Sequence, residues 1–132
     1  MRTALDTNIL SLFWSGGHWQ PRLPPAYQRR APSGRSVFVE LSAIPTGDAQ
    51  RVGKLLGEMN ITIDFDLGED VWRFAASSFA AYAIRRRRSG GGSPKRLLPD
   101  FVIASHALLK ADRLMTRDTN LYALDFPNLR LV

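Results

Sequence analysis

Two adjoining segments near the end of the chain decide the fold: Leu97-Leu98-Pro99-Asp100-Phe101-Val102-Ile103-Ala104-Ser105-His106-Ala107-Leu108-Leu109-Lys110 and Arg113-Leu114-Met115-Thr116-Arg117-Asp118. The first is predicted to be a helix opened by Pro99 and Asp100, and the second contains a short buried strand that ends before Asp118. In an open α/β sheet, helix starts and strand ends can meet at one rim, where ligands bind. Two such carboxylates repel unless a proton or a cation neutralises them. The alternative interpretation needs no ligand: Asp100 is then a helix cap and Asp118 a turn residue.

The rest of the chain alternates predicted strands with predicted helices. Residues 3–5, 61–65 and 129–132 are expected to be strands, and residues 36–41 either a strand or a strand running into a helix. Helices are expected after Asp6, where Thr7 and Asn8 can cap, after Asp48, and over residues 69–84. Strands separated by helices predict one domain over residues 1–132, with a mainly parallel sheet and helices on both faces.

Composition narrows the possible partners and the compartment. The 132 residues carry 18 Lys and Arg against 12 Asp and Glu, and the net charge of +6 favours a nucleic acid or an acidic protein as partner. The chain has no cysteine, which excludes disulfides and thiolate metal sites and suits a reducing cytosol. It contains neither an apolar run of about 20 residues nor the apolar core of a signal peptide. We therefore expect a cytoplasmic protein that does not cross a membrane.

Four carboxylates stand out because each follows or interrupts an apolar element: Asp6, Glu40, Asp100 and Asp118. Mg²⁺ and Mn²⁺ prefer carboxylate and water oxygens, and three or four acids are a usual protein share of such a site. The lack of cysteine and of paired histidine spacing argues against zinc. The sequence has no G-x-S-x-G motif, which argues against a serine hydrolase. It has no glycine-rich loop between a strand and a helix, which argues against a nucleotide-binding site.

The sequence resembles the PIN-domain family and, within it, the VapC-like toxins of toxin-antitoxin pairs. The resemblance rests on Leu5-Asp6-Thr7-Asn8-Ile9-Leu10, Glu40-Leu41, Leu98-Pro99-Asp100-Phe101-Val102-Ile103-Ala104, Leu114-Met115-Thr116-Arg117-Asp118 and Phe126-Pro127-Asn128-Leu129-Arg130-Leu131-Val132. These motifs span nearly the whole chain in the expected order. Pro45 and Gly47 depart from the pattern, because they interrupt the helix that usually continues after the second acid.

The resemblance implies a three-layer α/β/α sandwich and a ribonuclease that hydrolyses RNA phosphodiester bonds. Asp6, Glu40, Asp100 and Asp118 fall on the acidic positions of the family, which hold one or two Mg²⁺ or Mn²⁺ ions. Asn8 and Thr116 fall on its polar supporting positions, and they can orient the carboxylates. The resemblance also implies that the chain is the toxin of a toxin-antitoxin pair, with a cognate antitoxin as partner and a homodimeric state.

The remaining candidate residues keep more than one interpretation. Residues 85–96 have the composition of a mobile basic loop, in which Arg85, Arg86, Arg87 and Arg88 bind RNA phosphates, bind an acidic antitoxin tail, or are merely solvated. The stripe of Trp72, Ala75, Phe79 and Tyr82 is predicted to be core. His18 and His106 are expected to be packed or on the surface, Asp112 and Asp125 to be turn or surface acids, and Asp64 and Asp66 to end a strand and cap a helix.

Three other functions compete with the ribonuclease. A catalytically silent PIN-like RNA-binding module would keep the fold and the charge without metal-dependent cleavage. A DNA nuclease of related fold would cut single-stranded DNA but not structured RNA. A phosphatase with an aspartyl nucleophile would need a second Asp two residues after Asp6, where Asn8 stands.

Overall fold

Parallel strands form the centre of the fold. The structure is a computed structural model that describes residues 1–15, 18–19, 31–45, 47–93 and 95–132. Strand β1 (Thr3–Leu5) pairs in parallel with β6 (Arg113–Met115), and β4 (Ala31–Gly34) pairs in parallel with β5 (Ile61–Asp64). β4 also lies beside β1. A separate antiparallel pair joins β2 (Trp14–Ser15) to β3 (His18–Trp19). The predicted mainly parallel arrangement is confirmed.

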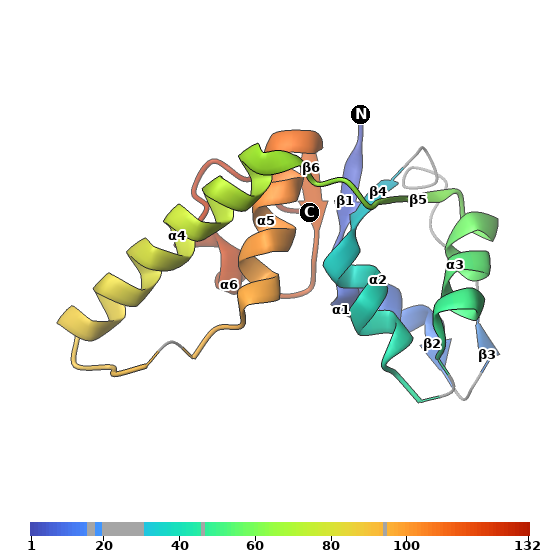
Figure 1. The fold of residues 1–132 in the computed structure, drawn as a ribbon, viewed down its shortest axis with the longest axis horizontal. Helices are drawn as coiled ribbons and strands as arrows, with labels where there is room; N and C mark the ends of the chain where they lie inside the picture. The colour runs from blue at the N-terminus through green and yellow to red at the C-terminus, as the bar shows by residue number, and fades with distance from the viewer. Residues whose placement is uncertain (16–17, 20–30, 46, 94) are drawn as a thin grey trace.

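Helices lie to either side of these strands. The helices in chain order are α1 (Thr7–Leu10), followed by a 3-10 turn η1 (Ser11–Phe13), α2 (Arg35–Ser42), α3 (Ala49–Glu58), α4 (Gly68–Arg88), α5 (Leu98–Lys110) and α6 (Thr119–Ala123). Figure 1 shows α4, α5 and α6 on one side of β1, and α2 and α3 on the other. The predicted α/β layering is therefore confirmed. None of the described helices is long and apolar enough to cross a membrane.

Helix α5 is the central packing element. Its residues Phe101 to Ala107 are all buried. The ring of Phe101 lies 5.0 Å from that of Phe79 and 5.5 Å from that of Tyr82, so aromatic contacts join α5 to α4. Ala75 and Tyr82 are buried as predicted, whereas Trp72 is 49% exposed, so the prediction that Trp72 belongs to the core is wrong.

Two boundaries differ from the sequence prediction. Residues 35–42 are helix α2, and the strand expected there is β4, which ends immediately before it. The four arginines 85–88 form the last turn of α4 and do not belong to a loop, so the prediction of a mobile basic loop at these residues is wrong. Positive side chains at a helix C-terminus interact favourably with its unpaired carbonyl groups, which explains why the helix extends this far.

Residues 20–30, the centre of the proline-rich segment, lie outside the described residues.

The chain end behaves largely as predicted. Leu131 forms a parallel bridge with Leu114, and the Leu114 backbone N–H donates to the carbonyl of Arg130 at 2.8 Å. The Thr116 N–H donates to the carbonyl of Val132 at 3.2 Å, so the last residues extend the sheet along β6. Asp48 caps α3 as expected, because its side chain accepts from the Arg51 N–H at 2.7 Å.

Candidate active site

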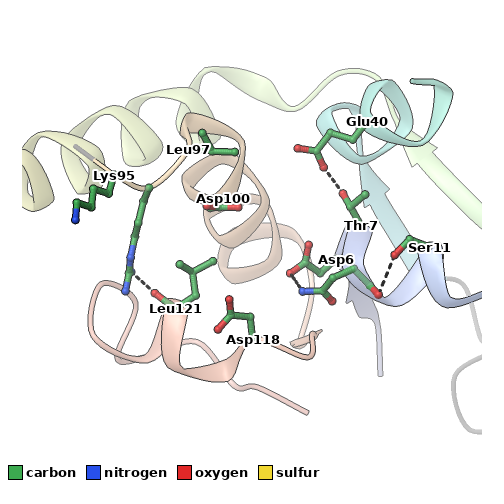
Figure 2. Close-up of a pocket in the computed structure, with 11 residues that line it drawn as sticks. Asp6, Thr7, Ser11, Glu40, Lys95, Leu97, Asp100, Asp118 and Leu121 are labelled. Carbon is green, nitrogen blue, oxygen red and sulfur yellow. Dashed lines mark hydrogen bonds between the residues drawn. The ribbon is translucent and has the colours of Figure 1, made fainter. Parts of the chain in front are cut away.

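The four acids singled out in the sequence line one cavity of about 450 Å³. Asp6 follows β1, Glu40 lies on α2, Asp100 lies in the first turn of α5, and Asp118 precedes α6. Figure 2 shows these carboxylates around the same space. Within the described part of the chain, no three His, Cys, Asp or Glu side chains stand as a formed metal-binding group. The structure thus brings the four acids to one cavity, and their chemical roles stay predictions.

Asp6 is the most tightly held of the four acids. The residue is 5% exposed, and its Oδ2 accepts from the hydroxyl of Thr116 at 2.7 Å and that of Tyr122 at 2.9 Å. The amide of Asn8 donates to the same oxygen at 3.0 Å. Among the described residues, none donates a hydrogen bond to the other carboxylate oxygen, Oδ1. A carboxylate fixed through one oxygen retains the second for a ligand.

Asn8 and Thr116 bond to Asp6 and to each other, and their role in orienting metal ligands stays a prediction. The Asn8 amide nitrogen also donates to the Thr116 hydroxyl at 3.0 Å, while its carbonyl oxygen accepts from the Arg117 N–H at 3.1 Å. The Thr116 hydroxyl in turn accepts from the Asp118 N–H at 3.1 Å. Together these bonds tie the segment after β6 to the end of β1, and therefore place Asp118 near Asp6.

Tyr122 is a member of this network that the sequence analysis missed. Its side chain is almost fully buried, and burial, together with the negative charge of Asp6, raises the pKa of its phenol well above the ordinary value. The phenol therefore stays protonated and donates to Asp6. The only sequence signal was its place four residues after Asp118, which is one helical turn.

Glu40 takes part in the cavity through a contact with α1. The Thr7 hydroxyl donates to its Oε2, so Thr7 does not cap α1 as predicted. Asp6 occupies the N-cap position of α1 instead, and its side chain makes no capping hydrogen bond. Because helix α2 ends at Ser42, the break at Pro45 and Gly47 leaves Glu40 on a regular helix.

Asp100 and Asp118 differ in burial. Burial raises the pKa of Asp100, a backbone hydrogen bond from Leu97 opposes the rise, and the negative charges of Asp6 and Glu40 add to it. Asp118 is exposed and stands at the N-cap position of α6 without a capping hydrogen bond from its side chain. Asp118 therefore does not act as a side-chain cap, whereas Asp100 has a contact with the backbone at the start of its own helix. The raised pKa of Asp100 therefore comes mainly from burial, and the acids around it contribute less.

Basic residues surround one side of the cavity. Lys95 and Arg96 line it, and Arg85 forms an ion pair with Asp125. Asp125 lies in the turn after α6, as one of its two predicted interpretations has it, but it is not a surface acid, because its side chain is 2% exposed and also pairs with Arg96. Asp112 is exposed, as expected, and accepts from the backbone N–H of Arg2.

The other arginines of the run behave differently from one another. The Arg86 guanidinium donates to the carbonyl of Ser93 at 2.6 Å and thereby closes the segment after α4. Arg87 and Arg88 are exposed. Of the four arginines predicted to bind RNA, Arg85 and Arg86 therefore have intramolecular partners, and Arg87 and Arg88 are exposed.

His106 is not among the described residues that line the cavity. His106 is 1% exposed, and its Nε2 lies 3.3 Å from Oδ2 of Asp64 at the end of β5, so the predicted packed role is confirmed. The Asp66 side chain accepts from the Gly68 N–H at 3.3 Å just before α4, which agrees with its predicted position at a helix start. The side chain of His18 lies outside the described residues.

A second hollow of about 270 Å³ adjoins the acid cavity, and we call it the apolar groove. It is lined by Ser36, Val39, Glu40, Leu67, Trp72, Leu98, Pro99 and Val102. Val39, Trp72 and Leu98 are 59%, 49% and 52% exposed, so large apolar side chains border it. Glu40 lines both hollows, and the apolar groove therefore leads to the acids.

Comparison with known proteins gives matches among solved structures. The chain aligns over its full length with a chain of the crystal structure of VapBC2 from Rickettsia felis bound to a promoter DNA fragment, with 19% identity, 98% of that chain covered and a TM-score of 0.60. It aligns equally completely with a chain of VapBC-1 from nontypeable Haemophilus influenzae, with 19% identity, 97% coverage and a TM-score of 0.64. This chain shares its fold with VapBC chains. The PIN-like, α/β fold expected from the sequence is thereby confirmed, whereas no family model and no curated protein matches.

Proposed function

We propose that this protein is a metal-dependent endoribonuclease and the VapC-like toxin of a toxin-antitoxin pair. The observation that carries the proposal is the convergence of Asp6, Glu40, Asp100 and Asp118 on one cavity in a chain with the fold of VapBC chains. The donor set fits Mg²⁺ or Mn²⁺, because it consists of carboxylate oxygens, one of which, Oδ1 of Asp6, has no described donor. Burial raises the pKa of Asp100 and the charges of Asp6 and Glu40 add to the rise, so a cation in the cavity would relieve the repulsion among these acids.

In this proposal the four acids hold the cation, and the surrounding side chains hold the acids. When bound, a divalent cation supplies a more acidic water as nucleophile and neutralises charge on the scissile phosphate and the leaving oxygen. Thr116, Asn8 and Tyr122 keep Oδ2 of Asp6 in place, and Thr7 orients Glu40. Lys95 lies exposed at the rim and supplies a positive charge for an RNA phosphate.

The partner in this proposal is a cognate antitoxin that covers the cavity. The apolar groove supports it, since exposed Val39, Trp72 and Leu98 border a hollow that leads to Glu40. Exposed apolar surface of this kind marks interaction sites more often than it marks free surface. We also propose that the protein is a homodimer, which light scattering after size-exclusion chromatography tests directly.

The test of the activity is cleavage of structured RNA with Mg²⁺, with Mn²⁺ and with EDTA. Wild-type protein is expected to cut only with a divalent cation, and Asp6→Asn or Asp100→Asn is expected to reduce cleavage by orders of magnitude. Glu58→Gln is the matched control, because Glu58 is an exposed acid outside the cavity. Cleavage of RNA by Asp100→Asn at the wild-type rate would contradict the assignment.

The same assay separates the competing functions. Binding of RNA without cleavage under any divalent cation indicates a silent RNA-binding module. Cleavage of single-stranded DNA but not of structured RNA indicates a DNA nuclease. Either result overturns the ribonuclease and leaves the fold intact.

A further inference from the structure

Asp118 lies at the start of α6, a short helix whose position depends on contacts with the rest of the protein. Helix α6 has five residues, and Asp118 occupies its N-cap position without a side-chain capping bond. A helix of this length is not stable by itself, so tertiary contacts set its position. One such contact comes from the buried phenol of Tyr122, which donates to Asp6 and holds α6 to the end of β1.

Arg96 supplies a second contact to α6, from the opposite side of the cavity. Its Nη1 donates to the carbonyl oxygen of Leu121, on α6, and to Oδ2 of Asp125, just after α6. Figure 2 shows the dashed bond that reaches Leu121 from the segment before α5. The Arg96 side chain is 21% exposed and that of Asp125 is 2% exposed, so the bonds are largely shielded from water. Ionic hydrogen bonds of this kind are stronger than neutral ones.

The backbone from which Arg96 extends is itself fixed. The hydroxyl of Tyr82, on α4, accepts from the backbone N–H groups of Lys95 at 3.1 Å and of Arg96 at 3.2 Å. The Arg96 guanidinium also lies 5.6 Å from the centre of the Tyr82 ring, within range of a cation-π interaction. The tyrosine ring is packed against Phe101 of α5. Arg96 therefore starts from the rigid contact between α4 and α5.

We propose that Arg96 is a positioning residue that holds Asp118 at a set distance from Asp100, and that Asp125 orients Arg96 for this task. Arg96 lies four residues before Asp100, and its guanidinium binds the helix that Asp118 opens. The two acids come from different elements, and the Arg96 side chain bonds the segment directly before α5 to α6. The proposal rests on the proposed function in so far as Asp100 and Asp118 are ligands of one site.

A positioning role and a purely electrostatic role predict effects of opposite sign. Arg96 lines the same cavity as Asp100 and Asp118, so its positive charge competes with a bound cation for the carboxylates. If charge alone mattered, loss of Arg96 would strengthen Mn²⁺ binding. If Arg96 positions Asp118, its loss weakens Mn²⁺ binding, as loss of groups that orient metal ligands usually does, by about 10- to 100-fold.

The experiment measures Mn²⁺ affinity by calorimetry and hydrogen exchange of residues 118–123 in EDTA. Arg96→Gln is expected to weaken Mn²⁺ binding about tenfold or more and to speed exchange in α6. Arg96→Met, which keeps packing on Tyr82, serves as a second variant if the first does not fold. Arg85→Gln is the matched control, because Arg85 is the other ion-pair partner of Asp125 and is not among the residues that line the cavity. It is expected to leave Mn²⁺ affinity near the wild-type value.

Two results overturn the inference. The first is Mn²⁺ binding by Arg96→Gln that is as tight as wild type or tighter, which makes Arg96 only a charge beside the site. The second is unchanged exchange of α6 in both Arg96 variants, which shows that other contacts hold the helix. A wild-type protein that binds no Mn²⁺ contradicts the proposed function, and the exchange measurement still decides whether Arg96 positions α6.

Discussion

Helix α5 carries two partly or fully buried ionisable residues whose surroundings differ. Asp100 lies in its first turn and His106 lies further along, near β5. Burial shifts both towards the neutral form, since it raises the pKa of Asp100 and lowers the pKa of His106. The neighbouring charges act differently: Asp6 and Glu40 add to the shift of Asp100, whereas Asp64 opposes the shift of His106.

The difference separates a binding site from a packed polar contact. Asp100 shares an open cavity with three acids of its own charge, and a bound cation would offset their repulsion. His106 is enclosed and has an acid beside it, so the protein itself satisfies the group. A cation should therefore change the stability of the protein through the Asp100 end of α5, and pH should change it through the His106 end.

The largest expected effect is at the Asp100 end. At a free concentration of about 100 times its Kd, Mn²⁺ should stabilise the wild type by roughly 2.7 kcal/mol, because it binds only the folded site. For a domain of this size that corresponds to a rise in Tm of roughly 8–16 °C. In EDTA, Asp100→Asn should melt at or above the wild type, since it removes one of several repelling carboxylates.

Thermal melts of both proteins in EDTA and in excess Mn²⁺ test this end of the comparison. Glu58→Gln serves as the control and should show the full wild-type shift. Equal Mn²⁺-induced shifts in wild type and Asp100→Asn would place Asp100 outside the site and leave it as an acid in the first turn of a helix.

Three of the four cavity-lining acids were predictable because they stand at element boundaries that local sequence marks, whereas Glu40 lies within α2. Asp6 follows the apolar residues of β1, Asp100 follows Pro99 at a helix start, and Asp118 follows the apolar residues of β6. The meeting of strand ends and helix starts at one rim is a property of parallel α/β folds, so these positions imply proximity. Asn8 and Thr116 were added from the resemblance, and their hydrogen bonds agree with it.

The residues that hold those acids could not be predicted from local sequence. The bond between Tyr122 and Asp6 joins positions 116 residues apart, and the ion pair between Arg96 and Asp125 depends on how α6 packs. Nothing in a turn sequence shows that Asp125 becomes buried. The helical state of the arginine run was also missed, because composition alone does not show that α4 continues past Ile84.

The next effect in size belongs to the His106 end. Because its folded-state pKa lies below the ordinary value of about 6.5, the unfolded chain takes up the proton more readily. Stability should therefore be complete above about pH 6.5 and should fall as pH drops below it, by at most about 1.4 kcal/mol per pH unit for one proton. The groups that face His106 are Asp64, which opposes the fall, and Lys110, which adds to it.

Urea unfolding at several pH values between about 5 and 8 measures this dependence in wild type and in His106→Gln. The glutamine variant is expected to be less stable at neutral pH but to lose less stability on acidification. Titration of the other histidine and of the acids is common to both proteins, so the difference between them isolates His106. If the difference in the free energy of unfolding between the two proteins stays constant over the whole pH range, His106 does not change its protonation on unfolding.

The smallest expected effect concerns the basic end of α4, which leads to the Asp100 end of α5. If RNA binds there, Arg87→Ser with Arg88→Ser should flatten the dependence of log K on log salt by roughly 0.7 for each phosphate that is no longer neutralised, or about 1.4 in all. Arg87 and Arg88 are exposed, whereas Arg85 and Arg86 are bound to Asp125 and to the carbonyl of Ser93. The two exposed arginines should therefore carry the salt-dependent contacts of the run.

Fluorescence anisotropy with a labelled RNA at several salt concentrations, in EDTA to prevent cleavage, gives the slope for each protein. Arg73→Ser is the control, because Arg73 lies near the start of the same helix and is paired on the surface with Glu69. Its slope is expected to match the wild type. Removing two cations from the last turn of α4 should cost only about 1 kcal/mol or less of stability, so the fold survives the change. An unaltered slope in the double variant would mean that RNA approaches Asp100 from another side, and that the end of α4 is solvated in the complex.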